Sequence, residues 1–231
     1  MNIAYLWWHY APTYKLAQYV VFPFVRKRYR VIGIQNIPKY TACVFAIGIH
    51  EHYDEPLIIG AHVHEIVTSY TTARFMFLQQ WVQSKERWLQ RRYSILKRHP
   101  RLARYCAMGL LPVGMIVTAT LLGTHSLPIT RKGDVGGVDA NTNRESTQRA
   151  LDILRSGGKV AVWITGGTKS SRIHPGALML ARDAGVVAIP VSINRRKKIV
   201  YFGKAITPPE NINDIMKDGK KIARWAQEKA Q

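Results

Sequence analysis

The chain has 231 residues, which is long enough for one domain with a substantial buried core and too short for two independent ones. Hydrophobic residues make up 47% of it and aromatic residues 10%, a composition that excludes an intrinsically disordered chain. Its 34 lysines and arginines against 14 acidic residues give a net charge of +20, which restricts the expected partner to a polyanion: nucleic acid, anionic lipid headgroups or a phosphorylated small molecule.

The first thirty residues combine many aromatic side chains with a cationic cluster from Arg26 to Arg30. Trp and Tyr suit the headgroup region of a bilayer, and adjoining cations attract anionic lipid. We therefore expect residues 1–30 to form a helical, membrane-associating segment; a helix packed on the domain core is the alternative. Trp7 and Trp8 interrupt the apolar stretch that a cleavable signal would need, so the expected location is the cytoplasmic side.

Two short runs rich in β-branched residues follow, at 31–34 and 43–47, and they predict strands separated by the turn-prone segment 36–38. The second predicted strand delivers His50 at its C-terminal end. Beyond it, apolar and basic residues alternate at helical spacing from Phe75 to Arg98. This pattern predicts a long, basic, amphipathic helical stretch.

Residues 106–123 carry no charge over roughly the minimum length that spans a bilayer. Because Pro112 and three glycines weaken a spanning helix, we expect a buried or partly inserted segment; a transmembrane helix is the alternative. Cys106 in this segment and Cys43 both lie in apolar runs, without the close spacing of a metal site or a redox pair. Both are therefore predicted to be core thiols.

The C-terminal half alternates between helices and strands. In chain order, the sequence predicts a helix at 146–154, a strand at 160–164, a helix at 177–184 and a strand at 186–193. The last three of these elements form a βαβ unit. The fold class that we expect is α/β, with a single domain at 31–231 that contains a mixed, largely parallel sheet flanked by helices.

A first group of reactive side chains follows the second predicted strand. His50 leaves the strand, and Asp54 and Glu55 come four and five positions later. A carboxylate at that separation can fix the imidazole tautomer while the other ring nitrogen removes a hydroxyl proton. A surface ion pair is the ordinary alternative. A metal site formed with His52 is the other alternative, but no further ligand at suitable spacing follows in the sequence.

A second group follows the strand at 160–164. Thr165-Gly166-Gly167-Thr168-Lys169 is a glycine turn with hydroxyls and a cation, and Arg172 adds charge. Backbone N–H groups of such a loop can approach an anion closely, which predicts phosphate binding. The spacing differs from that of a P-loop, so nucleotide hydrolysis is not expected.

The order of these blocks resembles the glycerol-phosphate and lysophosphatidate acyltransferase family, whose signatures are Asn-His-x4-Asp, a later Arg, Phe-Pro-Glu-Gly-Thr-Arg-Ser and a Val-Pro-type strand. His50 matches the catalytic histidine, and Glu55, which precedes a proline, matches the acid. Arg131 matches the arginine of the second block, residues 164–170 match the third, and 175–177 with 188–191 match the remainder.

The resemblance implies an acyltransferase of phospholipid biosynthesis that works as a peripheral or monotopic protein on the cytoplasmic face of a membrane. His50, oriented by Glu55, would act as general base. Arg131 and Lys169 would hold the acceptor phosphate, with Gly166, Gly167 and Thr168 lining its loop. The implied partners are anionic membrane lipid, a lysophospholipid acceptor and an acyl donor, with acyl-CoA or acyl-carrier protein as co-substrate; no cofactor or metal is implied.

The sequence departs from the family pattern at four places: Gly48-Ile49 stands where the family has its usual residue before the histidine, Glu55 replaces an aspartate, Gly166 a glutamate and Lys169 an arginine. Asp54 becomes the working acid if the turn is one residue shorter. A lipid-binding relative without catalysis is one alternative function. A basic nucleic-acid-binding protein is the other, although no helix-turn-helix, zinc finger or single-strand-binding pattern is evident.

Overall fold

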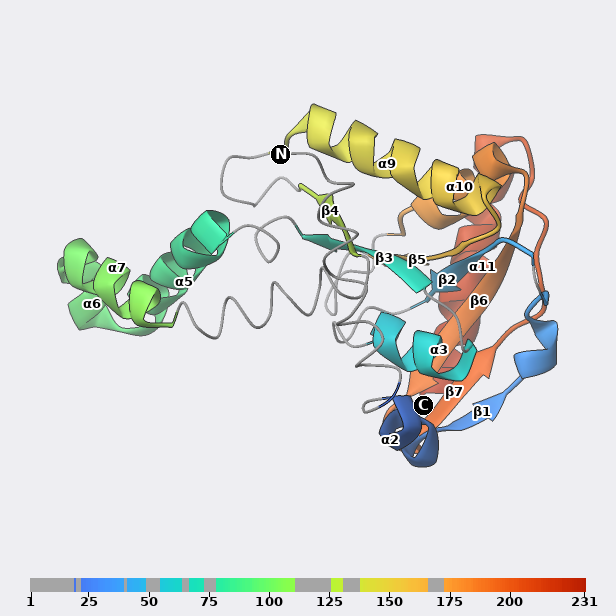
Figure 1. Ribbon diagram of the computed structural model, residues 1–231, viewed down its shortest axis with the longest axis horizontal. Helices are drawn as coiled ribbons and strands as arrows, with labels where there is room; N and C mark the ends of the chain where they lie inside the picture. Colours follow the sequence, from blue (N-terminus) through green and yellow to red (C-terminus); the bar gives the residue numbers. More distant parts are fainter. Residues whose placement is uncertain are drawn as a thin grey trace. The chain divides into compact units, whose positions relative to one another are not determined.

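We describe the fold from a computed structural model (Figure 1). The structure describes residues 19, 22–39, 41–48, 55–63, 67–72, 78–110, 126–130, 138–165 and 173–231. The helices and strands in these ranges are, in chain order, α2 (Phe22–Arg28), β1 (Arg30–Ile32), the 3-10 helix η2 (Ile34–Asn36), β2 (Cys43–Ile47), α3 (Glu55–Val63), β3 (Val67–Thr72), α5 (Leu78–Arg92), α6 (Ser94–Arg98), α7 (Pro100–Gly109), β4 (Ser126–Ile129), α9 (Ala140–Arg155), β5 (Lys159–Trp163), α10 (Gly176–Ala184), β6 (Val187–Asn194), β7 (Ile199–Phe202) and α11 (Ile212–Ala230).

The described strands form one sheet in the order β1-β7-β6-β2-β5-β3-β4. Strand β2 is parallel to β6 and to β5, β3 is parallel to β5, β1 is parallel to β7, and β7 is antiparallel to β6. The protein is therefore an α/β fold with a mixed, mostly parallel seven-stranded sheet flanked by helices, as the sequence predicted.

The chain divides into two compact units, and strand β3 contributes to both. One unit contains the described parts of 15–69 and 147–231, and the other contains the described parts of 70–146. In the first unit, β2 is buried along its whole length, and Phe45 packs against Phe202 of β7 with ring centroids 5.9 Å apart. This is the hydrophobic core on which helices α10 and α11 pack.

Helix α11 is attached to the sheet by one apolar stripe and by hydrogen bonds at its C-terminal end. The stripe consists of Ile215, Gly219, Ile222 and Ala226, at the three- and four-residue spacing of one helix face. From β6, Ser192 Oγ donates to the Ala226 carbonyl at 2.8 Å. Asn194 Nδ2 donates to the Lys229 carbonyl at 3.1 Å, in the last turn of the helix, where carbonyls lack helical partners.

Helix α2 is the part of the expected membrane segment that the structure describes. Phe22 and Val25 are buried, and Arg26 Nε donates to the Ala61 carbonyl of α3. Phe24 points the other way and is 64% exposed, as Tyr19 is at 79%. One side of this segment therefore packs on α3, while aromatic side chains remain exposed to solvent.

The prediction that both cysteines are core thiols is wrong for Cys106. Cys43 is buried in β2, but Cys106 is exposed on α7 because the packed side of that helix is formed by Ala103 and Ala107. Of the uncharged segment 106–123, only Cys106 to Leu110 lies among the described residues. Over all described residues, the structure has no helix that is both long and apolar enough to cross a membrane.

Candidate active site

The carboxyl ends of β2 and β5 meet at one edge of the sheet. These strands are parallel neighbours with Ile47 opposite Trp163, and the Ile164 amide donates to the Ile47 carbonyl at 2.8 Å. On its other side, the ladder of β2 is extended by the Gly48 amide, which donates to Val191 at 3.0 Å. Proteins with an α/β sheet bind their ligands just outside the carboxyl ends of the parallel strands. This edge of the sheet is therefore the candidate active site.

Glu55 is the first residue of α3 and is only 2% exposed. The Trp163 indole Nε1 donates to Glu55 Oε2 at 2.5 Å, and Trp163 is itself buried. Burial of a carboxylate is unfavourable unless hydrogen bonds replace its water, and a hydrogen bond to a charged acceptor is short and strong. The N-terminus of a helix also favours negative charge. Glu55 is therefore held at the carboxyl end of β5.

The residues on either side of the candidate phosphate-binding loop are held together. Thr165 and Ile173 form an antiparallel bridge, and the His174 amide donates to the Ile164 carbonyl at 2.6 Å. Helix α11 packs against the same place, where a β-carbon added to Gly219 would lie 3.2 Å from Ile173 Cγ2. Both ends of the segment 166–172 are thus fixed next to the strand end that carries Trp163.

In the other unit, the backbone that leads to Arg131 is fixed by the start of α9. The Thr130 amide donates to Asn143 Oδ1 at 2.8 Å, and Asn143 Nδ2 donates back to the Thr130 carbonyl at 3.1 Å. The Asp139 amide donates to the Thr130 hydroxyl at 2.7 Å. Both backbone groups of Thr130 are therefore bound by one amide side chain, immediately before Arg131.

Asp139 in turn stabilises the first turn of α9. Its carboxylate accepts from the Thr142 hydroxyl at 2.6 Å and from the Asn141 amide at 3.0 Å. These hydrogen bonds hold the pKa of Asp139 below its ordinary value, and the hydrogen bond from the Thr142 side chain has the largest effect. Because the folded-state pKa is lowered, the stabilisation is present above the pKa of the unfolded state and is lost as the pH falls through the folded-state pKa.

Of the predicted site residues, Glu55 is the one that the structure describes. The others lie outside the described residues, and these are His50, Asp54, Arg131, Gly166, Gly167, Thr168 and Lys169. His52, which belongs to the alternative metal site, also lies outside the described residues. Within the described ranges, no group of three or more His, Cys, Asp or Glu side chains could hold a metal ion.

Sequence reasoning missed two residues that shape this region, Trp163 and Asn143. Trp163 was expected only as a strand residue, although an indole N–H at the buried end of a strand needs an acceptor. That requirement was the available signal for the pair with Glu55. Asn143 gave no signal, because an Asn in a polar helix is unremarkable until the strand beside it is known.

Comparison of the chain with protein-family models, with curated proteins and with solved structures gives no match. The function is therefore argued from the geometry of β2, β5 and α3, together with the sequence blocks that follow these strands.

Proposed function

We propose that this protein is an acyltransferase that moves a fatty acyl group from acyl-CoA or acyl-carrier protein onto a lysophosphatidate-like acceptor at the cytoplasmic face of a membrane. The reaction belongs to phospholipid biosynthesis, and in this proposal the chain is a peripheral or monotopic membrane protein. The resemblance of the sequence blocks to the glycerolipid acyltransferases motivates the proposal.

The observation that carries it is the buried pair of Glu55 and Trp163, with Nε1 and Oε2 2.5 Å apart. An acid that serves only as a surface charge has no reason to lie 2% exposed at the carboxyl end of a parallel strand. His50 follows β2 by three residues in the sequence, and Gly166 follows β5 by the same number, so each block comes after a strand that ends at this edge of the sheet. The position of Glu55 therefore supports the proposal that it orients a histidine that follows β2.

In the proposed chemistry, one ring nitrogen of His50 takes the proton of the acceptor hydroxyl while Glu55 stabilises the imidazolium. The hydroxyl oxygen attacks the thioester carbonyl carbon, the carbon–sulfur bond breaks, and the thiol leaves with the proton returned from His50. The products are an ester and a free thiol, and neither a covalent enzyme intermediate nor a metal is required.

The cations supply acceptor binding in this proposal. Arg131 and Lys169 hold the acceptor phosphate, and Gly166, Gly167 and Thr168 line its loop. The fixed backbone at Thr130 supports this role for Arg131, because a cation that follows a rigid strand end needs little ordering when the phosphate binds.

The test is mass analysis of the lipids formed from mixed lysolipid acceptors and acyl donors, by wild type, His50→Ala and His99→Ala. A positioned base contributes on the order of 100- to 10,000-fold, so His50→Ala should lose at least about 100-fold in kcat. His99 is exposed between α6 and α7, and His99→Ala should keep wild-type turnover.

Wild-type turnover in His50→Ala would refute His50 as the base. A wild type that forms no ester with any acceptor, but that still binds lysolipid, would refute acyl transfer and favour the lipid-binding relative without catalysis.

A further inference from the structure

Helices α5, α6 and α7 enclose a core of few side chains. Leu89, Leu96, Ala103 and Ala107 are buried against one another, and Val82 packs on them. Two of these residues are alanines, whose small side chains let α7 approach the other helices closely.

Apolar exposure is concentrated on these helices. Seven of the thirteen large hydrophobic side chains that are exposed in the described ranges lie between residues 78 and 110, and they are Trp88, Tyr93, Ile95, Leu102, Tyr105, Met108 and Leu110. Their exposed fractions run from 38% to 70%. On α7, Leu102, Tyr105 and Met108 follow one another at three-residue spacing, which is one helix face. That face lies away from the packed Ala103 and Ala107.

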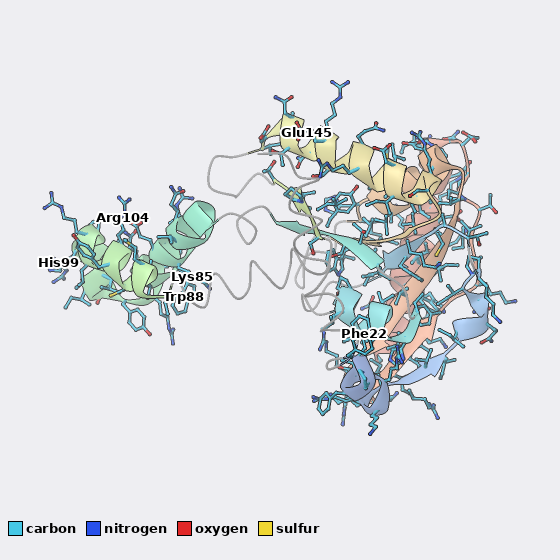
Figure 2. All side chains as sticks on the ribbon, in the orientation of Figure 1. Phe22, Lys85, Trp88, His99, Arg104 and Glu145 are labelled. Atoms are coloured by element: carbon cyan, nitrogen blue, oxygen red, sulfur yellow. The ribbon has the colours of Figure 1, made fainter. Side chains whose placement is uncertain are left out.

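Aromatic rings meet cations on α5. The Trp88 ring lies edge-on to Tyr93 with centroids 6.4 Å apart, and Lys85 Nζ lies 6.0 Å from the Trp88 centroid. Figure 2 shows the side chains of Lys85 and Trp88 on α5 and that of Arg104 on α7. Rings with one polar edge beside an ammonium group are the combination that settles at the boundary between headgroups and acyl chains.

The charge of the same helices is strongly positive. Residues 78–110 contain eight lysines and arginines and a single acidic residue, Glu86, a net charge of +7. Seven of these cations are exposed, and they are Arg87, Arg91, Arg92, Lys97, Arg98, Arg101 and Arg104. Each cation near an anionic bilayer contributes to binding, so the sum favours a polyanionic surface.

We propose that α5–α7 form a docking surface for an anionic membrane, in which Trp88, Tyr93 and the face formed by Leu102, Tyr105 and Met108 enter the headgroup region while the arginines bind lipid phosphate. An anionic bilayer fits better than nucleic acid, because exposed leucine and methionine side chains gain little against a sugar-phosphate backbone but are removed from water by lipid. This surface is formed by residues that lie outside the N-terminal segment in the sequence, and the inference stands whether or not the protein transfers acyl groups.

The experiment measures binding of the full chain to vesicles of phosphatidylcholine alone and of equal parts phosphatidylcholine and phosphatidylglycerol. The apolar variant is Leu102→Ser/Tyr105→Ser/Met108→Ser, and the charge variant is Arg101→Gln/Arg104→Gln. All five side chains are exposed, so the fold should survive, which circular dichroism checks. The matched controls lie on α11: Ile212→Ser for the apolar change, and Lys220→Gln/Arg224→Gln for the charge change.

We expect wild type to prefer the anionic vesicles, and each variant of α7 to lose about tenfold or more in affinity while both controls bind as wild type does. Brominated lipid should quench tryptophan fluorescence in wild type and quench it less in Trp88→Phe. Transfer between short-chain, water-soluble substrates should be unchanged in the α7 variants, which separates this test from that of the proposed reaction.

Equal vesicle affinity of wild type and both α7 variants would overturn the proposal. So would an equal loss in the α11 controls, because binding would then not depend on the α7 side chains in particular. Tighter binding to duplex DNA than to vesicles, abolished in Arg101→Gln/Arg104→Gln, would assign the surface to nucleic acid instead.

Discussion

Glu55 illustrates how one buried side chain can depend on another that is 108 residues away in the sequence. The carboxylate has exchanged water for an indole N–H, so the pair is stable only while both members are present. A change in Trp163 should therefore affect both the stability of the fold and the orientation of Glu55.

Trp163→Phe keeps an aromatic ring at the end of β5 and removes the N–H donor. We expect the free energy of unfolding to fall by about 1–3 kcal/mol, since a buried acceptor loses a partner. We also expect kcat to fall with little change in the acceptor KM, because the loss concerns the base and not phosphate binding. Denaturant titration and steady-state kinetics measure the two effects.

Trp88→Phe is the control, since Trp88 is 53% exposed and should change stability by no more than about 0.5 kcal/mol. If Trp163→Phe is less stable than wild type but has an unchanged kcat, Glu55 is a structural acid and not the partner of His50.

Asp54 and Glu55 are both candidates for orienting His50. Replacing each carboxylate with the corresponding amide distinguishes between them. Gln at position 55 can still accept from the indole, so Glu55→Gln should fold and should lose kcat because it no longer stabilises a positive imidazolium. Asp54→Asn should retain most of its turnover. The opposite pattern in steady-state kinetics would move the role to Asp54.

At the scale of elements, runs of β-branched residues between turn signals were sufficient to predict β2, β5 and β6, and the helical pattern at 177–184 predicted α10, all to within about a residue or two. β3 was not predicted, because Val67–Thr72 contains four hydroxyl-bearing side chains besides Val67 and Tyr70. α11 was not predicted either, since its charged residues outnumber its buried apolar ones. The indole of Trp163 signals that an acceptor is needed, but no local pattern in the sequence identifies the distant Glu55 as that acceptor.

The packing of α11 on the end of β2 leaves no room for a side chain at Gly48. A β-carbon there would lie 2.0 Å from the Ala226 β-carbon, a distance that forces the helix or the strand to move. Gly48→Ala should therefore lower the free energy of unfolding by about 1–3 kcal/mol, as overpacking does. Since His50 lies two residues further on, the variant should lose activity as well. Thermal or denaturant unfolding measures the change in the free energy of unfolding.

A second substitution tests whether the clash with Ala226 causes the loss of stability in Gly48→Ala. Ala226→Gly removes the atom that clashes, so adding it to Gly48→Ala should recover part of the lost stability, beyond what the two single changes add up to. Gly176→Ala is the matched control, because nothing lies within 4 Å of its added β-carbon and it starts a helix. Equal losses in Gly48→Ala and Gly176→Ala would exclude the clash as the reason.

At the scale of the whole molecule, the net charge of +20 is distributed unevenly along the chain. Residues 26–30 carry four cations, and residues 78–110 carry eight. Both stretches also expose aromatic side chains, Phe24 in the first and Trp88 in the second. Two stretches of the sequence thus combine positive charge with exposed aromatic rings.

The N-terminal contribution is best tested by deleting residues 1–18, because a longer deletion would remove Phe22, which is only 1% exposed in α2. We expect this truncation and the Leu102→Ser/Tyr105→Ser/Met108→Ser variant each to weaken binding to anionic vesicles, and their combination to weaken it most.

Raising the salt from about 0.1 M to about 1 M shortens the Debye length from about 10 Å to about 3 Å, so the affinity for anionic vesicles should fall for wild type and for every variant. Binding that persists at high salt should be lowest in the combined variant, since it depends on apolar insertion. Vesicle binding by the truncated protein that equals that of the full chain at both salt concentrations would remove residues 1–18 from the membrane-associating segment and leave α5–α7 as the attachment.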